Sequence, residues 1–316
     1  MNLPQKATQP TIYFIGVTTA KSSIMKVFPL WAKALGLKDA VIMGIDIEIH
    51  AQPEVYREVV DFIKNDELSI GALVTTHKID LYNAAKDMFE YLDPYAAMFG
   101  ELSSISKKDG RLEGYAKDPI TCGLALEAFV PKNFFKEHGG DVLLLGAGGS
   151  AISMSAYLLN KNKGNNLPSR LIVGNRSKPR LDEIEKIVRA VNPDAAAEFY
   201  LTPEASQNDA LVRKLKPCSL IVNATGLGKD RPGSPLTNAV EFPENSLVWE
   251  INYRGNLLFM DQALAQKKEK KLHVEDGWIY FIHGWTQVIA EVFHLDISGS
   301  LFDECERIAN EIRENG

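Results

Sequence analysis

A lysine lies two residues beyond a strand-like stretch in the first third of the chain. The apolar run LSIGALVTT at 68–76 predicts a buried strand, and His77 and Lys78 stand between it and a helical pattern. A lysine held in a cleft can take or give the proton of a hydroxyl group if burial or a nearby cation lowers its pKa from about 10.4. Lys78 is therefore a candidate catalytic residue, with His77 as a structural neighbour. The alternative is a solvated lysine at a strand end.

A glycine-rich turn forms the second candidate site. VLLLG predicts a strand from Val142, and a helix opens immediately after the turn, in the pattern G-x-G-x-x-A. Glycines at these positions allow a tight turn and a close approach of the backbone to a pyrophosphate, which then faces the helix N-terminus. The alternative is a glycine turn without a ligand. The candidate dinucleotide-binding residues are Gly146, Ala147, Gly148, Gly149, Ser150 and Ala151.

The next predicted strand indicates which dinucleotide would bind. A site for NAD places a carboxylate at this strand end, but RLIVGN is followed by Arg176, Ser177, Lys178 and Arg180. Guanidinium groups suit a ribose 2′-phosphate, so NADP is favoured over NAD. We assign Asn175, Arg176, Ser177 and Arg180 to the cofactor, although these cations would also suit a solvated loop.

A third strand end belongs to the same predicted sheet. The run SLIVNATGLG at 219–228 ends in polar and glycine residues, and ligands of open α/β sheets lie beyond the carboxyl ends of the strands. This segment is expected beside the nicotinamide half of the cofactor, or else is an ordinary glycine turn. Its candidate residues are Asn223, Ala224, Thr225 and Gly228.

Apolar runs alternate with helical patterns along most of the chain, which predicts an α/β protein with parallel sheets. A first series of strands and helices ends in a hairpin at 103–116, whose turn is Asp109-Gly110. A segment at 131–141 reads as a linker, and a second series starts at Asp141. The predicted domains are 1–120, completed by helices at about 283–316, and a dinucleotide-binding domain at 121–282.

Composition excludes several classes of protein. The chain has 316 residues, a net charge of -6 and three scattered cysteines. Nothing suggests a nucleic-acid footprint, a disulfide framework or a metal site. The N-terminus lacks an apolar signal core, and no run is long enough to span a membrane. We expect a cytoplasmic protein with a small-molecule partner.

The order of these motifs resembles that of the shikimate/quinate dehydrogenase family. THK at 76–78, GYAKD at 114–118, GAGGSA with NRSKPR, and NATGLG stand in the family's sequence of motifs, from FIGVTTAKSS to the helix GWIYFIHGW. The resemblance implies an N-terminal substrate domain, a Rossmann-type domain that binds NADP, and a C-terminal helix that returns to the first domain. It also implies hydride transfer between NADP and a ring hydroxyl or ketone of a cyclic acid, and makes a homodimer possible.

The resemblance also implies roles for single residues. Lys78 and Asp118 would form the catalytic pair, while Asp118 could instead serve as a helix N-cap before Pro119. Gly277 and Tyr253 would line the cofactor site, and Tyr253 would also reach the substrate. The remaining substrate-binding candidates are Lys21, Ser22, Thr75, Ser103 and Gln287.

Departures from the family pattern concentrate on the substrate. Hydrophobic or small residues replace polar ones at Ile24, Ala72 and Gly284, while Lys21 and Lys117 add positive charge. Hydroxyl groups left unpaired in a desolvated site cost about 1 to 3 kcal/mol each. We therefore expect an anionic substrate that differs from shikimate in its hydroxyl groups.

Two other functions remain open from the sequence. One is a two-domain dehydrogenase for an unrelated anionic substrate. The other is an NADP-binding sensor or an inactive paralogue. A screen of substrates distinguishes the first, and binding of NADP without turnover would indicate the second.

Overall fold

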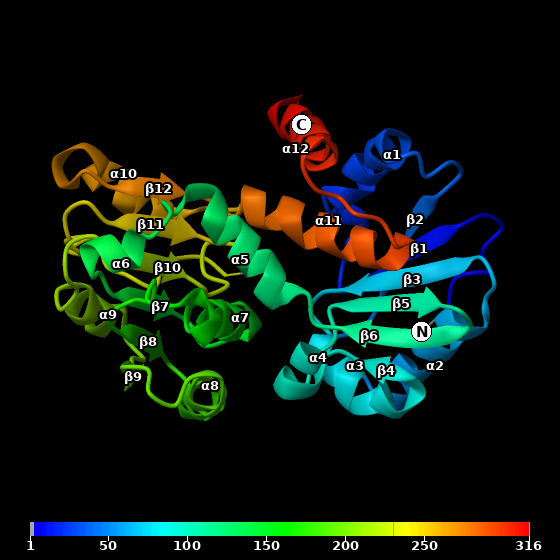
Figure 1. Ribbon diagram of the computed structural model, residues 1–316, viewed down its shortest axis with the longest axis horizontal. Coiled ribbons are helices and arrows are strands. Elements are labelled where there is room, and N and C mark those ends of the chain that lie inside the picture. The colour runs from blue at the N-terminus through cyan, green and yellow to red at the C-terminus, as the bar shows by residue number, and fades with distance from the viewer. Residues whose placement is uncertain (1–2, 230, 316) are drawn as a thin grey trace. The chain divides into compact units, whose positions relative to one another are not determined.

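The computed structural model describes residues 3–229 and 231–315 (Figure 1). The chain folds into two compact units, Met1–Lys117 with Ile282–Gly316, and Asp118–Phe281. Residues 1, 2 and 316, at the ends of the first predicted domain, lie outside the described part. The chain enters the second unit at Asp118 and leaves it within a long helix, α11 (Trp278–Phe293).

The first unit is built on a mixed sheet. Its strands lie in the order β2-β1-β3-β5-β6-β4, with β1 parallel to both β2 and β3, and β5 antiparallel to β3 and β6. Asp109 and Gly110 both have positive φ in the β5–β6 turn, as the hairpin prediction requires. The bounds are β1 Thr11–Gly16, β2 Val41–Asp46, β3 Ser69–Val74, β4 Tyr91–Leu92, β5 Ser104–Lys108 and β6 Arg111–Tyr115.

Alternating side chains of β1 are buried on both faces of this sheet. Tyr13 and Ile15 join a core with α2 (Pro53–Asn65) and α3 (Lys78–Ala85). Phe14 points the other way and meets Trp285 of α11 edge to face, with ring centroids 5.0 Å apart. Helices therefore cover both faces of this sheet, and a functional site is expected at the ends of its strands. A short helix, α4 (Pro94–Phe99), precedes β5.

The C-terminal segment packs against the first unit, as the family resemblance implies. Helix α1 (Ile24–Ala34) lies beside α12 (Ser300–Asn315), shown in blue and red in Figure 1. The buried indole N–H of Trp31 donates to the carbonyl of Cys305 at 2.7 Å. Phe28 packs against Phe293 at the end of α11. These contacts fix the second half of α11 on this sheet.

The second unit contains a parallel sheet. Its strands lie in the order β12-β11-β10-β7-β8-β9, and the pairings described within it are parallel. Numbered along this unit alone, the order is 3-2-1-4-5-6 read from the other edge, which is the arrangement of dinucleotide-binding folds. The strands are β7 Val142–Leu145, β8 Leu171–Asn175, β9 Ala197–Leu201, β10 Leu220–Asn223, β11 Leu247–Glu250 and β12 His273–Glu275.

Helices cover both faces of this sheet too. Leu143 and Leu145 of β7 form a core with α9 (Ala205–Val212) and α10 (Leu258–Lys270). Helix α7 (Gly149–Leu158) packs against α5 (Asp118–Phe129) and α8 (Lys178–Val191). The segment interpreted as a linker also contains a short helix, α6 (Phe134–His138), which is anchored by buried aromatic residues. The predicted Rossmann-type fold is confirmed.

Two exclusions concern the whole described chain. The three cysteines are free thiols, so no disulfide links them. Among the described helices, none has both the length and the apolar character needed to cross a bilayer.

His283 of α11 gives the first unit a predictable acid sensitivity. Its ring is 7% exposed and stacks on Phe302, and burial lowers its pKa from 6.5 to about 4. A base with a depressed pKa stabilises the fold above pH 6.5, and this contribution is lost as the pH falls toward 4. The loss should reach roughly 3 kcal/mol.

Urea unfolding at several pH values tests this expectation. His283→Phe keeps the ring stack but has no titrating group, so the variant should lose much less stability than the unaltered chain between about pH 6.5 and pH 4. His294→Gln, at an exposed histidine beyond the same helix, is the matched control and should retain the original slope. Equal slopes for all three proteins would show that His283 does not titrate in this way.

Candidate functional sites at the two sheet edges

The turn after β7 has the geometry of a phosphate-binding loop. Gly146 has φ +114°, and a Cβ there would lie 2.6 Å from the carbonyl oxygen of Ala224, so no other residue fits without strain. At Gly148, the residue before α7, a Cβ would meet no atom within 4 Å. That open space lies at a helix N-terminus, whose N–H groups and dipole favour an anion. The predicted loop residues therefore fit a dinucleotide pyrophosphate.

The cations after β8 differ in their availability. Lys178 pairs with Asp182, and Arg180 pairs with Glu183 at 2.8 Å, both along the exposed surface of α8. Arg176 is exposed, and in the described part of the chain its guanidinium has no ion pair or hydrogen bond. Asn175 donates to the carbonyl of Ser177 at 3.3 Å and shapes the turn. Of the predicted cations, Arg176 is thus the one most free to meet a 2′-phosphate.

The segments that follow β10, β11 and β12 meet at the same edge of the sheet. Asn223, the last residue of β10, accepts hydrogen bonds from the N–H and hydroxyl of Thr225 at 3.1 and 2.6 Å. Gly228 has φ +92° and lies close to the carbonyl of Asn256. A Cβ at Gly277 would lie 1.9 Å from the carbonyl oxygen of Ile251. These glycines are required by close backbone contact between segments.

Aromatic rings also gather at this edge. Tyr253 packs against Trp278 and Phe281, with centroid distances of 5.3 and 5.0 Å, and the latter two rings are stacked on each other. Nearby, the thiol of Cys122 donates to the hydroxyl of Tyr280 at 3.4 Å. Tyr253 was predicted to lie at this edge, whereas Trp278 and Tyr280 were not, because an aromatic residue in an apolar helix gives no functional signal.

In the first unit, three chain segments converge at the carboxyl end of β1 and β3. The N–H and hydroxyl of Thr75 donate to the carbonyl of Ile15 at 3.0 and 3.2 Å. The N–H of Val74 donates to the carbonyl of Ser103, since β5 runs antiparallel to β3. Thr75, just after β3, and Ser103, just before β5, therefore lie at the same end of two neighbouring strands.

Lys78 is the first residue of α3, and its backbone is held from two sides. Its N–H donates to the carbonyl of Thr75 at 3.3 Å, and its carbonyl accepts from the N–H of Leu102 at 3.1 Å. The imidazole of His77 is fully buried, lies 3.3 Å from the hydroxyl of Tyr56, and has a pKa lowered by burial. His77 thus packs in the core as a neutral ring and anchors the start of the helix that carries Lys78.

The turn after β1 carries the two proposed substrate contacts Lys21 and Ser22. Thr19, just before them, donates from its N–H and hydroxyl to Asp46 at 2.8 and 2.6 Å. A Cβ at Gly44 would lie 1.9 Å from the Thr19 hydroxyl, so glycine leaves room for this contact. Lys21 is exposed and Ser22 half-buried on this fixed turn.

Several residues at departures from the family pattern have structural roles. Ile24 and Ala72 are fully buried in the core. Lys117 forms an ion pair with Glu291, and its ammonium lies 4.6 Å from the ring centroid of Tyr115. The charge of Lys117 is therefore balanced by Glu291 within the first unit. Lys117 does not add the net positive charge that the sequence predicted at this position. Gln287 is half-buried on α11.

Asp118 begins α5 and is 9% exposed. It follows Lys117 and opens the second unit, whereas Lys78 belongs to the first. Ser103 helps to define this junction, because its hydroxyl accepts from the N–H of Lys117 at 2.7 Å and donates to the carbonyl of Tyr115 at 3.4 Å. The hydroxyl proposed to bind substrate is thus used to hold the backbone that leads to Asp118.

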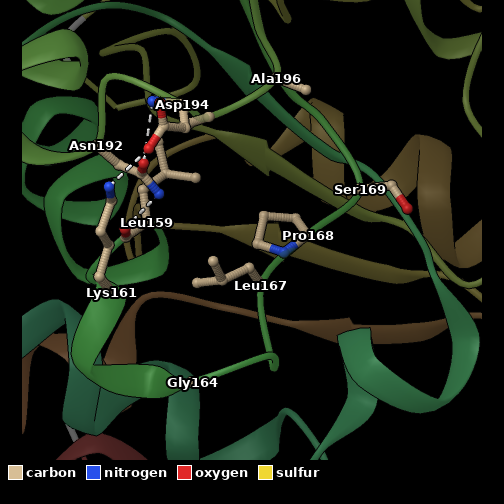
Figure 2. A pocket seen from close by; sticks show the side chains of 10 residues that line it. Leu159, Lys161, Gly164, Leu167, Pro168, Ser169, Asn192, Asp194 and Ala196 are labelled. Atoms are coloured by element: carbon tan, nitrogen blue, oxygen red, sulfur yellow. Dashed lines mark hydrogen bonds and ion pairs between the residues drawn. The ribbon is translucent and has the colours of Figure 1, made fainter.

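A pocket of about 450 Å³ lies elsewhere in the second unit (Figure 2). Its lining includes Ser169 and Ala196, just before β8 and β9, and Lys161, which pairs with Asp194 at 2.8 Å. These strand starts are opposite to the carboxyl ends that carry the phosphate loop. The pocket contains none of the residues that the sequence assigned to a ligand.

Comparison with known proteins relates the chain to one family. A shikimate dehydrogenase (NADP+) of Streptococcus thermophilus is 29% identical over 191 residues, which covers 59% of this chain and 60% of the relative. One from Lactococcus lactis subsp. cremoris is 26% identical over 163 residues, covering 52% and 54%. The chain thus matches little more than half the length of these curated relatives. No family model matches it.

Solved structures share the fold over nearly the whole chain. A Thermus thermophilus shikimate 5-dehydrogenase in complex with NADP(H) and shikimate has TM-score 0.69 and 23% identity, covering 95% of this chain and 99% of that one. A Corynebacterium glutamicum quinate dehydrogenase in complex with NAD has TM-score 0.72 and 16% identity, covering 96% and 99%. A Gluconobacter 5-ketofructose reductase has TM-score 0.69 and 16% identity, covering 96% and 99%. The predicted family resemblance and fold are confirmed.

Adjacent serines test the structural role of Ser103. Ser103→Ala should lower the free energy of unfolding by about 1 to 3 kcal/mol, because the N–H of Lys117 loses its acceptor. The buried hydroxyl of Ser104 has no hydrogen-bond partner among the described residues, so Ser104→Ala should be neutral or stabilising. Urea unfolding measures both. Equal effects would contradict the role assigned to Ser103.

Proposed function

Because the chain resembles the shikimate/quinate dehydrogenases in sequence and fold, we propose that it is an NADP-dependent dehydrogenase acting on a hydroxyl group of a cyclic acid. The observation that carries the proposal is the loop after β7, where Gly148 leaves open space at the N-terminus of α7. Open space beside an exposed glycine is common, so the space counts here because it lies between strand β7 and a helix N-terminus, where an anion is favoured. The names of the relatives support NADP as the cofactor.

Residues of the second unit would hold the cofactor along the carboxyl edge of its sheet. The loop from Gly146 to Ala151 would bind the pyrophosphate, and Arg176 would pair with the 2′-phosphate. Thr225, Gly228 and Tyr253 would lie toward the nicotinamide half. When bound, NADP accepts or donates the hydride at its nicotinamide ring.

Lys78 and Asp118 would handle the proton. In the oxidation direction, the Lys78 amine takes the proton of the substrate hydroxyl as the hydride leaves its carbon, and in reduction the ammonium returns it. The Asp118 carboxylate would orient the lysine and accept a hydrogen bond from a second hydroxyl. The fixed backbone of Lys78 supports this role, because a proton-transfer group must be held in position.

The proposed substrate is an anionic cyclic acid other than shikimate itself. Lys21 and Ser22 would receive its carboxylate on the turn that Asp46 stabilises. Ile24 and Ala72 are fully buried and offer no hydroxyl or amide to a ring. Since Glu291 balances Lys117, the attraction for an anion rests chiefly on Lys21. We also propose a homodimer, on the family resemblance alone.

A second candidate is a dehydrogenase for a different polar carbonyl compound. The 5-ketofructose reductase with TM-score 0.69 favours it, because the same fold there carries a name outside the ring acids. If the chain binds a dinucleotide but turns over no acid or ketose, we would infer an NADP-binding sensor.

Replacing Lys78 tests the catalytic assignment. NADP-linked absorbance should be followed with shikimate, quinate and related ring acids, and with 5-ketofructose. Lys78→Ala should lower kcat on the best substrate by about 10² to 10⁴, because proton transfer is lost. Lys86→Ala, at an exposed lysine just beyond the same helix, should leave kcat unchanged.

The result also separates the substrate hypotheses. Best turnover of shikimate would contradict the interpretation of Ile24 and Ala72. Turnover confined to the ketose would replace the ring acid as substrate. An unchanged kcat in Lys78→Ala would remove this lysine from the mechanism.

Arg176 provides a test of cofactor choice. Arg176→Ala should weaken NADP+ binding by about 10- to 100-fold, the effect of losing a charge-assisted hydrogen bond, and leave NAD+ binding unchanged. Lys186→Ala, at an exposed lysine of α8 that is not assigned to the cofactor, is the matched control and should bind both dinucleotides as before. Titration calorimetry with each dinucleotide measures both. Equal weakening of NADP+ and NAD+ in Arg176→Ala would show that Arg176 does not contact the 2′-phosphate.

A further inference from the structure

A buried carboxylate stands at the end of β11, on the edge assigned to the cofactor. Glu250 is 1% exposed, and its Oε2 accepts from the side-chain amide of Asn223 at 2.6 Å. Its Oε1 accepts from the backbone N–H of Asn252 at 2.9 Å and from the Asn252 side-chain amide at 2.6 Å. Among the described residues, Glu250 has no ion pair. Three N–H donors therefore satisfy a buried acid that lacks a cationic partner.

Hydrogen bonds of the two asparagines connect Glu250 to three segments of the chain. The Asn223 oxygen fixes Thr225 in the segment after β10. The Asn252 amide also donates to the carbonyls of Thr225 and Leu227, at 3.2 and 3.4 Å. The Asn252 carbonyl accepts from the N–H of Gly277, after β12, at 3.1 Å. Glu250 is thus the shared acceptor beneath the segments that follow β10, β11 and β12.

We propose that Glu250 is a positioning residue whose ionised carboxylate holds these three segments together and so sets the affinity of the edge for a dinucleotide. The effect of Glu250 on dinucleotide affinity rests on the proposed function, whereas its effect on the order of the segments does not.

The hydrogen bonds require the ionised form. Every partner of Glu250 is an N–H donor, so a proton on either oxygen would face another donor. Reversing the Asn223 amide would offer its oxygen to the acid, but the same oxygen now holds the N–H and hydroxyl of Thr225. One proton at Glu250 therefore breaks contacts in the segment after β10, whichever way the amide turns.

Glu250 gains or loses its proton near neutral pH. Burial raises the pKa of Glu250 to about 7, and the negative charge of Asp276 acts in the same direction, against the hydrogen bonds from both asparagines. At 224–231 and 251–257, the described residues Lys229, Arg231 and Arg254 are also charged, and Glu250 forms an ion pair with none of them. The ionised fraction then falls from about nine-tenths at pH 8 to about one-tenth at pH 6, a tenfold change in the binding-competent form.

Hydrogen exchange on the protein without cofactor tests the ordering. Protection factors, corrected for intrinsic rates, should fall by about tenfold for residues 224–228 and 251–254 between pH 8 and pH 6. Glu250→Gln should give low protection at both pH values, because its amide places a donor against a donor. Asp209→Asn is the matched control: Asp209 is a buried carboxylate of the same unit that binds Thr237 and has no hydrogen bond to residues 224–228 or 251–254. It should keep the original pH dependence.

Dinucleotide affinity tests the consequence. NAD+ is the probe, because it lacks the 2′-phosphate, a phosphate monoester that itself titrates near pH 6. Calorimetry should show about tenfold weaker binding at pH 6 than at pH 8 for the unaltered chain and for Asp209→Asn. Glu250→Gln should bind weakly with a flat profile.

The outcomes separate the two proposals. If neither NAD+ nor NADP+ binds at any pH, the proposed function fails, while hydrogen exchange still decides the role of Glu250. A flat protection profile in the unaltered chain overturns the inference, and so does the original slope in Glu250→Gln. If Glu250→Gln does not fold, the profile of the unaltered chain alone settles the question.

Discussion

Parallel strand pairing is the constraint on which the rest of this structure depends. It brings the carboxyl ends of β7, β8, β10, β11 and β12 to one edge of a sheet, although they are far apart in the sequence. Backbone groups at such an edge bind each other, water or a ligand. Gly146 and Gly277 let neighbouring segments approach each other closely there, and Gly148 leaves space beside a helix N-terminus. Binding capacity thus arises from the same geometry that closes the sheet.

The chain segments beyond the strand ends are fixed in different ways in the two units. In the first, Asp46 fixes the turn that carries the proposed substrate contacts, since it binds Thr19 beside Gly44. In the second, a single buried carboxylate, Glu250, organises neighbouring segments through two amides. Burying a charge without a cation is costly, and hydrogen bonds from three donors offset part of that cost. A site held in this way responds to pH, whereas one held by glycine packing does not.

Local patterns say more about some residues than about others. The glycine-rich turn between a strand and a helix could be predicted because all three are contiguous in the sequence. Ser103 was assigned to the substrate by its place in a motif, yet its hydroxyl holds the N–H of Lys117. Lys117 counted as added charge until its contact with Glu291, 174 residues away, was known. A motif shows which residue types are present, but not which partners satisfy them.

The sequence by itself determined the succession of strands and helices, the hairpin at Asp109-Gly110, the dinucleotide loop and the family resemblance. These depend on periodicity and on residues close together in the chain. Only the tertiary structure decided that Arg176 lacks an ion-pair partner in the described chain while Lys178 and Arg180 have one, and that Ile24 and Ala72 are core residues. It alone brought Asn223, Glu250 and Asn252 into one network. The physical reason is that burial and hydrogen-bond partners are set by strand order and packing, which join residues that the sequence keeps apart.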